Sequence, residues 1–232
     1  MGTVDLPWIR RIAAVASLGD ENRRRLYEYV LDARDAVGRD EAALALELPR
    51  SSASFHMDRL VRDGLLQVEF RKPPHKTGPG SGRPSKLYRP VAEEIGVSIP
   101  ERNYDLAGHL MAAAIKRAEI DGSPVGPTLR EVADAKGSEL GRPGDFLGAL
   151  SELGYEPSPD DSGGYRLLNC PFHRLSREHK EVVCGMNGAL LGGVAAASGL
   201  RAEEVVPDPE HGPGHCCARI ALIDNGSQAT GT

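Results

Sequence analysis

The feature that most constrains the fold is the stretch 39–90, where two helix patterns precede two strand patterns. "RDEAALALELPRS" predicts a short helix that ends before Pro49, because the residue preceding a proline disfavours the α conformation. "SSASFHMDRLVRDG" predicts a second helix that is capped by serine, closed by Gly64 and carries apolar Phe55, Leu60 and Val61. "LLQVEFRK" and "KLYRPV" predict strands on either side of the Gly/Pro-rich loop "PPHKTGPGSGRPS". Together they predict a helix–turn–helix followed by a hairpin.

Two further helices are expected upstream. Residues 8–18 place apolar side chains along one helical face, and Asp20 is a candidate N-cap for an amphipathic helix that ends near Gly38. With these helices the order becomes helix, helix, short helix, turn, helix, hairpin. We therefore predict that residues 1–91 form a winged helix-turn-helix domain.

The charge distribution supports a polyanionic partner for this domain. The chain has 232 residues and a net charge of −5, with 28 Lys and Arg against 33 Asp and Glu. Residues 1–90 contain 16 basic and 12 acidic residues, which leaves 12 basic and 21 acidic residues for the remainder. Residues 50–90 alone have nine basic and three acidic residues. A basic first part joined to an acidic second part predicts that the first part meets DNA.

The expected DNA contacts lie at the start of the second helix and on the hairpin. A helix that begins with small hydroxyl residues can bring its N-terminal end close to base edges in the major groove. A basic loop can lie along the adjacent minor groove or the backbone. The alternative is a small interaction module with a solvated basic surface. The candidate contacts are Arg50, Ser51, Ser52, Ser54, His56, Arg59, His75, Lys76, Arg83 and Lys86.

A long helix is predicted in the segment 92–122, which we interpret as a linker and a dimerisation helix. Within 102–120 the apolar side chains fall close to one stripe, namely Leu106, Leu110, Ala113, Ala114 and Ile120. Pairing of this helix with its copy would place two winged modules on a two-fold axis, so that they meet two half-sites. The alternative is a helix that packs on its own domain.

Residues 123–232 are expected to form a small α/β domain. Helices are predicted in 128–141 and 144–157 and a long one in 176–199, with strands in 163–170, 203–209 and 216–223. Such alternation predicts a long helix lying across a sheet. The whole chain is thus expected to be α+β. The longest apolar run, 188–200, is too short to span a bilayer, and no secretory signal is recognisable, so we expect a cytoplasmic protein.

Four cysteines fall in this second part: Cys170, Cys184, Cys216 and Cys217. Their spacing does not match a zinc ribbon or finger, which uses paired C-x-x-C knuckles. Each predicted element carries its own thiol, so a shared site would be assembled by tertiary structure. Cys170 and the tandem at 216–217 adjoin polar loops, where thiols are placed for ligation or redox chemistry. Buried inert cysteines are the alternative.

The C-terminal motifs "NCPF", "HKEVVC" and "GHCCARI", together with the winged domain ending in "GRPSKLYRPV", resemble the SufR-like repressors. These are winged-helix regulators of iron–sulfur cluster assembly genes. The resemblance covers residues 10–223 and implies a transcriptional repressor whose operator affinity depends on a cluster. It implies Cys170, Cys184 and Cys217 as the thiolate ligands, and it favours [4Fe–4S] over [2Fe–2S].

The fourth ligand is left open by the sequence. Adjacent cysteines on a strand point to opposite faces, which argues against both Cys216 and Cys217 binding one cluster. Here "C-x-R-I" favours Cys217 as the first residue of the strand. The candidates for the remaining position are Cys216, His215, His211, His179 and His173.

Other functions are weighed against this one. Thiolates with imidazoles also suit Zn²⁺, and a winged-helix regulator could instead sense haem or oxidants through its thiols. An enzyme would need Cys170 or Cys184 as nucleophile with His173 or His179 as base. His179 and Cys184 are five residues apart and so do not stack on one helical face, and no phosphate-binding glycine loop is present. We therefore do not expect an enzyme.

Overall fold

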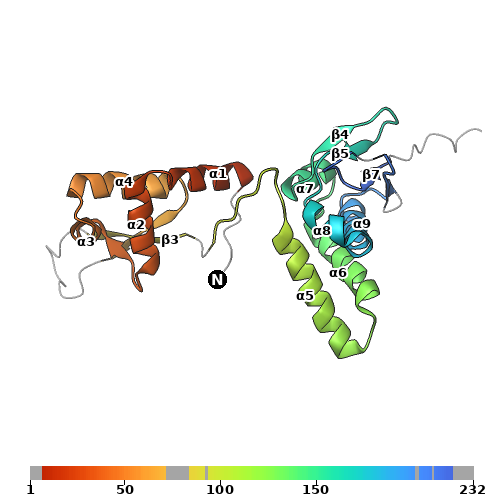
Figure 1. The fold of residues 1–232 in the computed structure, drawn as a ribbon, viewed down its shortest axis with the longest axis horizontal. Coiled ribbons are helices and arrows are strands. Elements are labelled where there is room, and N and C mark those ends of the chain that lie inside the picture. Colours follow the sequence, from red (N-terminus) through yellow and green to blue (C-terminus); the bar gives the residue numbers. More distant parts are fainter. Residues whose placement is uncertain (1–6, 72–83, 92–93, 202–203, 211, 222–232) are drawn as a thin grey trace, which may run out of the picture. The chain divides into compact units, whose positions relative to one another are not determined.

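The computed structural model describes residues 7–71, 84–91, 94–201, 204–210 and 212–221 (Figure 1). The chain divides into two compact units, with the boundary between Val97 and Ser98. Each unit combines helices with one small antiparallel sheet. The predicted α+β class is confirmed at this level.

The first unit contains four helices, α1 (Trp8–Ser17), α2 (Glu21–Asp32), α3 (Arg39–Ala45) and α4 (Arg50–Arg62). The Asp20 side chain caps α2 by accepting a hydrogen bond from the Arg23 N–H at 3.0 Å, as predicted. α2 ends earlier than expected, because Val37 and Gly38 form a short strand. α4 follows Pro49 without a side-chain cap, so the prediction of a serine cap is wrong and Ser51 and Ser52 lie within its first turn.

The sheet of the first unit consists of β1 (Val37–Gly38), β2 (Leu66–Arg71) and β3 (Ser85–Pro90), in the order β1-β3-β2. β2 and β3 form the predicted antiparallel hairpin, with Val68 opposite Tyr88. The core beneath it joins all four helices to the sheet. Its largest fully buried members are Leu26, Met57, Leu60, Leu65, Leu66 and Tyr88.

The second unit contains α5 (Tyr104–Asp121), α6 (Val125–Leu140), α7 (Phe146–Glu152), α8 (His173–Glu178) and α9 (Lys180–Ala197). The single long helix expected over 176–199 is instead two helices, interrupted at His179. α6 and α9 pack closely because two glycines face the opposite backbone. A Cβ on Gly137 would lie 2.1 Å from the Leu190 carbonyl oxygen, and a Cβ on Gly193 would lie 2.1 Å from that of Asp134.

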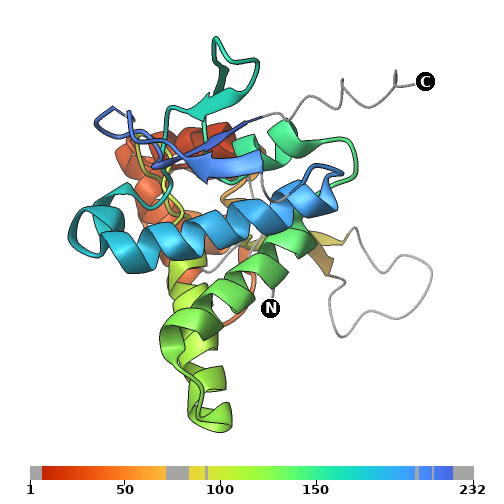
Figure 2. The same ribbon diagram turned by 90° about the vertical axis from the view of Figure 1, so that its right-hand side faces the viewer.

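The second sheet consists of β4 (Pro157–Pro159), β5 (Tyr165–Leu167), β6 (Val205–Pro207) and β7 (Ala218–Ile220). Its order is β4-β5-β7-β6 and every pairing is antiparallel. The expectation of an α/β domain is therefore wrong, because the described sheet has no parallel pair. α9 packs against this sheet (Figure 2), and the shared core includes Met186, Leu190, Leu167 and Ile220.

α5 belongs to the second unit, where it packs on α6. Its buried face is formed by Ala107, Leu110, Ala114 and Ala118. Two members of the predicted stripe, Leu110 and Ala114, therefore lie inside this unit, as in the alternative of a helix packed on its own domain. α5 also exposes Ile115 and Ile120, at 47% and 74%.

Candidate functional site

Three separate segments bring the four cysteines together. Cys170 follows β5 in the turn before α8, Cys184 lies in the second turn of α9, and Cys216 and Cys217 directly precede β7. Two backbone hydrogen bonds hold the first and last segments side by side: Cys170 N–H to the Gly214 carbonyl at 3.1 Å, and Cys216 N–H to the Leu167 carbonyl at 2.9 Å. None of the four cysteines forms a disulfide. Residues separated by up to 47 positions thus form one thiol site.

Cys170, Cys184 and Cys217 line a common cleft with a volume of about 410 Å³. These are the three cysteines that the resemblance implies as ligands. His173 and His215 line the same cleft, and so do the cations Arg177 and Lys180. No carboxylate is found among the described residues of the lining. The cleft therefore presents soft thiol donors and imidazoles in a positively charged setting, which suits an anionic thiolate-bound group.

The thiols interact with one another, and this separates their pKa values. The Cys216 thiol donates a hydrogen bond to the Cys170 sulfur, which lowers the pKa of Cys170 although burial opposes this. The pKa of Cys216 is raised because its thiol donates to its neighbours and is buried. Burial, with hydrogen bonding to Cys217, raises the pKa of Cys184 to about 12. Cys170 is thus the thiol best prepared to act as a thiolate.

Cys216 differs from the other three in its surroundings. It is 1% exposed and is not among the residues that line the cleft. Its sulfur accepts a hydrogen bond from Asn187 Nδ2 at 3.1 Å, and the Asn187 Oδ1 in turn accepts one from the Tyr155 hydroxyl. Both cysteines precede β7, so Cys217 is not the first residue of the strand and the argument from strand alternation does not apply to them. Their thiols contact each other.

The candidate histidines are distributed unevenly around the thiols. His173 and His215 line the cleft, whereas His179 lies at the interruption between α8 and α9 and is not part of the lining. The Gly212 N–H donates a hydrogen bond to Nδ1 of His215 at 3.2 Å. Desolvation, together with nearby Arg102 and Arg177, lowers the pKa of His173 and so favours a neutral imidazole. His211 lies outside the described residues.

The thiols do not surround a single point. Among the residues that the structure describes, no three Cys, His, Asp or Glu side chains are placed to hold one metal ion. A tetrahedral Zn²⁺ requires its sulfur and nitrogen ligands at ~2.0–2.3 Å from one centre. The observed arrangement lines a cleft instead of closing on one ion.

The loop that carries Cys170 is hydrogen-bonded to the residues that lead into α5. Arg102 Nη1 donates to the Cys170 carbonyl at 3.0 Å and also to Oδ1 of Asn169. The Asn103 N–H donates to the Pro171 carbonyl at 3.1 Å, and Asn169 Nδ2 donates to the Glu101 carbonyl at 2.9 Å. The thiol site and the entry to α5 are therefore one connected structure.

The sequence analysis did not identify Arg102, Asn169 or Asn187. Asn169 stands within the quoted motif "NCPF", directly before Cys170, so its position was a usable signal. No sequence signal pointed to Arg102 or Asn187, because their partners, Cys170 and Cys216, are 68 and 29 residues away along the chain. Only the fold makes them neighbours of the thiols.

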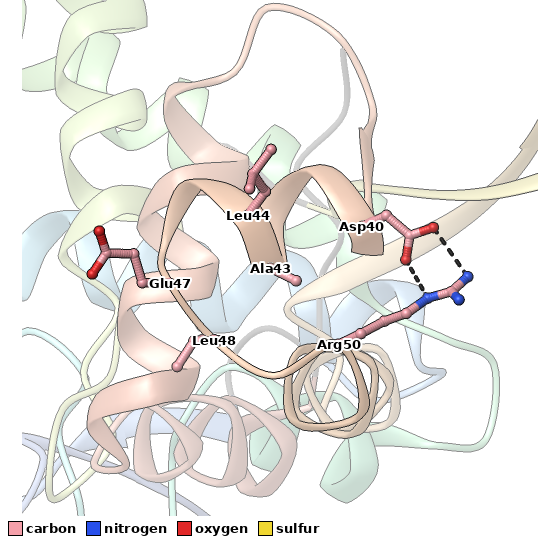
Figure 3. Close-up of a pocket in the computed structure, with 6 residues that line it drawn as sticks. All are labelled: Asp40, Ala43, Leu44, Glu47, Leu48 and Arg50. Carbon is pink, nitrogen blue, oxygen red and sulfur yellow. Dashed lines mark hydrogen bonds and ion pairs between the residues drawn. The ribbon is translucent and has the colours of Figure 1, made fainter.

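The expected DNA-contacting cations of the first unit are paired with carboxylates. Arg50 binds Asp40 through two contacts, with Nη2 at 3.0 Å from Oδ2, next to a surface pocket between α3 and the start of α4 (Figure 3). Arg59 Nε lies 2.9 Å from Oδ2 of Asp63.

The third cation, Lys86, binds Asp58, which also accepts a hydrogen bond from the Tyr88 hydroxyl at 2.7 Å. Burial alone would raise the pKa of Asp58, but the hydrogen bonds from Lys86 and Tyr88 lower it. Asp58 therefore stays ionised and ties β3 to α4.

The remaining expected contacts differ in accessibility. Ser51 is exposed, Ser52 and Ser54 are half-buried, and the His56 side chain is only 12% exposed, beside the Asp20 carboxylate. Phe55, one of the apolar residues of the predicted helix, is 67% exposed on α4. His75, Lys76 and Arg83 lie outside the described residues.

Comparisons with known proteins do not assign a family. No family model matches the chain, and no significant match is found among curated proteins or solved structures. In the part of the chain that the structure describes, every helix is too short or too polar to cross a membrane.

Proposed function

We propose that this protein is a DNA-binding transcriptional repressor whose operator affinity is set by an iron–sulfur cluster, and that it is not an enzyme. The observation that carries the proposal is the convergence of Cys170, Cys184 and Cys217 on one cleft from three separate segments. The resemblance to SufR-like repressors named the same three residues. In this proposal the protein controls iron–sulfur assembly genes or related redox-responsive genes. It acts in the cytoplasm, where thiols stay reduced.

The first unit supplies the DNA-binding part of the proposal. α3 and α4 are joined by a short turn in which Glu47 has a left-handed backbone, and the β2–β3 hairpin follows directly. This order is that of a winged helix-turn-helix, with α4 as the recognition helix. Ser51, Phe55 and Arg59 are exposed on α4 and would face the major groove.

The second unit supplies the sensor. Thiolates of Cys170, Cys184 and Cys217 would hold the cluster, which when bound makes the protein responsive to oxidants, nitric oxide or iron supply. [4Fe–4S] is favoured over [2Fe–2S]. Thiols and imidazoles that line one cleft also suit Zn²⁺, which remains the fallback metal.

The link between sensor and DNA is the segment that enters α5. Arg102 and Asn103 bond to the backbone of Cys170 and Pro171, so the position of the ligand loop determines the position of the helix start. The exposed Ile120, a member of the predicted stripe, would pack against a second copy in a homodimer. A shift at Cys170 would then change the spacing of two recognition helices on the operator.

A thiol–disulfide switch is the second candidate. The specific observation in its favour is the hydrogen bond between the thiols of Cys170 and Cys216. In this case the protein would sense an oxidant without a metal.

The decisive experiment is an absorbance spectrum of the protein purified without air, with iron, acid-labile sulfide and zinc measured on the same sample. Broad absorption near ~400 nm with matching iron and sulfide supports the cluster. DNA fragments selected from a random library then show whether loaded and metal-free protein differ in affinity. A colourless protein containing zinc, or no metal, contradicts the cluster, and failure to select any DNA sequence contradicts the repressor.

A further inference from the structure

The thiol cleft offers three sulfur ligands, but cluster irons are usually held by four protein donors, and histidine replaces cysteine in some clusters. We infer that His173 supplies the fourth ligand. This inference rests on the proposed function. Its basis is the position of each candidate donor relative to the cleft lined by Cys170, Cys184 and Cys217.

Cys216 is unsuited to the fourth position although it is a thiol. It does not line the cleft and is 1% exposed. Its sulfur already accepts a hydrogen bond from Asn187, which is itself held by the buried Tyr155. To bind in the cleft, Cys216 would have to leave this network and leave the buried Asn187 amide without its partner, which costs free energy.

His215 lines the cleft, but its ring accepts a hydrogen bond where a metal-bound ring would donate one. A metal-bound histidine donates its second ring N–H to a carboxylate, a carbonyl or water. Here Nδ1 of His215 accepts from the Gly212 N–H, so the ring proton must reside on Nε2 and neither nitrogen is free to bind a metal. His179 does not line the cleft.

His173 differs from the other candidate donors that the structure describes. It lines the cleft with the three thiols, and its imidazole forms no hydrogen bond with any described residue, so one ring nitrogen can bind a metal while the other donates to water. Its backbone N–H donates to the Cys170 carbonyl at 3.1 Å, which places it in the same turn as that ligand. Among the described residues that line the cleft, no carboxylate competes for the position. As the first residue of α8, it can adjust its rotamer without disturbing the core.

The ligand differs in kind from the other three. A neutral imidazole in place of a thiolate leaves the cluster less negative, and histidine ligation raises cluster potentials. His173 is half-buried and lines the cleft.

The test uses the full chain, labelled with ¹⁵N-histidine and reconstituted anaerobically with iron and sulfide. Pulsed EPR of the paramagnetic form of the cluster detects coupling to a ligated nitrogen. We expect this coupling in the unmodified protein and in His215→Ala and His179→Ala, and its loss in His173→Ala. His173→Cys should keep iron and sulfide and also lack the coupling.

Two results would overturn the inference while leaving the proposed function intact. They are a cluster without nitrogen coupling in the unmodified protein, and coupling that persists in His173→Ala. An unmodified protein that takes up no iron and sulfide overturns both. Far-UV circular dichroism of each variant separates loss of the ligand from loss of the fold.

Discussion

The two units use charge in opposite ways. In the basic first part, three cations that we expect at DNA are each paired with an aspartate: Arg50 with Asp40, Arg59 with Asp63 and Lys86 with Asp58. In the acidic second part, Arg177 and Lys180 line the thiol cleft, and neither forms an ion pair with any residue that the structure describes. Net charge alone therefore does not show which cations are paired with a carboxylate. Local pairing decides which surface is ready to receive an anion.

The two units should also differ in how firmly they hold an anion. An exposed ion pair is worth ~0–1 kcal/mol, so a phosphate can displace an aspartate at little cost. Among the described residues, no carboxylate lines the thiol cleft, so no side chain there would compete with a bound anion. We therefore expect the first unit to bind its anion reversibly and the second unit to retain its anionic group. The following predictions test this difference.

The largest effect is expected from removing a thiol that lines the cleft. Serine at Cys170, Cys184 or Cys217 should abolish the iron and sulfide content, because each supplies a ligand. Cys216→Ser is the matched control and should retain the cluster, since Cys216 faces Asn187 instead of the cleft. Absorbance and metal analysis after anaerobic reconstitution provide the measurement. Retention of the cluster by Cys170→Ser, or its loss only in Cys216→Ser, would refute the ligand set.

The second prediction concerns the stability of the second unit. Gly193→Ala should destabilise the second unit by roughly 1–3 kcal/mol, because the new methyl group meets the Asp134 carbonyl in the α6–α9 contact. Gly188→Ala on the same helix has open space and should be neutral or stabilising by up to ~1 kcal/mol. Urea unfolding followed by circular dichroism measures both. Equal effects of the two substitutions would show that α6 and α9 do not pack this closely.

The third prediction concerns the connection between the thiol site and α5. Arg102→Gln should leave the cluster in place but reduce the ratio of DNA affinities between loaded and metal-free protein, expected at about 5–150-fold, towards one. The reason is loss of the bond from Arg102 to the Cys170 carbonyl. Arg117→Gln, within α5 and paired with Glu131, serves as control. An unchanged ratio in Arg102→Gln would exclude this connection.

The smallest effect is expected in the first unit. Asp40→Asn should free Arg50 and strengthen DNA binding by a factor of about two to five, consistent with the ~0–1 kcal/mol value of an exposed pair. The slope of log affinity against log salt should steepen by about one phosphate contact. Asp161→Asn removes the same charge from the second unit and should change neither quantity. If Asp40→Asn weakens binding, Arg50 needs its partner for orientation.

Local signals in the sequence determined much of the first unit. Pro49 separates α3 from α4, Asp20 caps α2, and the alternation of 66–71 and 85–90 yields the hairpin. These succeed because each depends on neighbours within a few residues. The prediction of a serine cap for α4 also rested on near neighbours but was wrong, because Pro49 occupies the cap position. The sequence shows Phe55 and Leu60 only as apolar residues of this helix, and helical periodicity alone does not say that Leu60 is buried and Phe55 exposed.

For the thiol site, the motifs predicted Cys170, Cys184 and Cys217 as ligands, whereas the tertiary structure decided how the four cysteines differ. The burial of Cys216 against Asn187, the position of His173 in the cleft and the bond from Arg102 to Cys170 join residues far apart in the chain. The pairing of Arg50 with Asp40 likewise depends on how α3 meets α4. Such contacts are set by packing between elements, so a linear pattern lists the donors, but only the folded chain determines which of them face the same space.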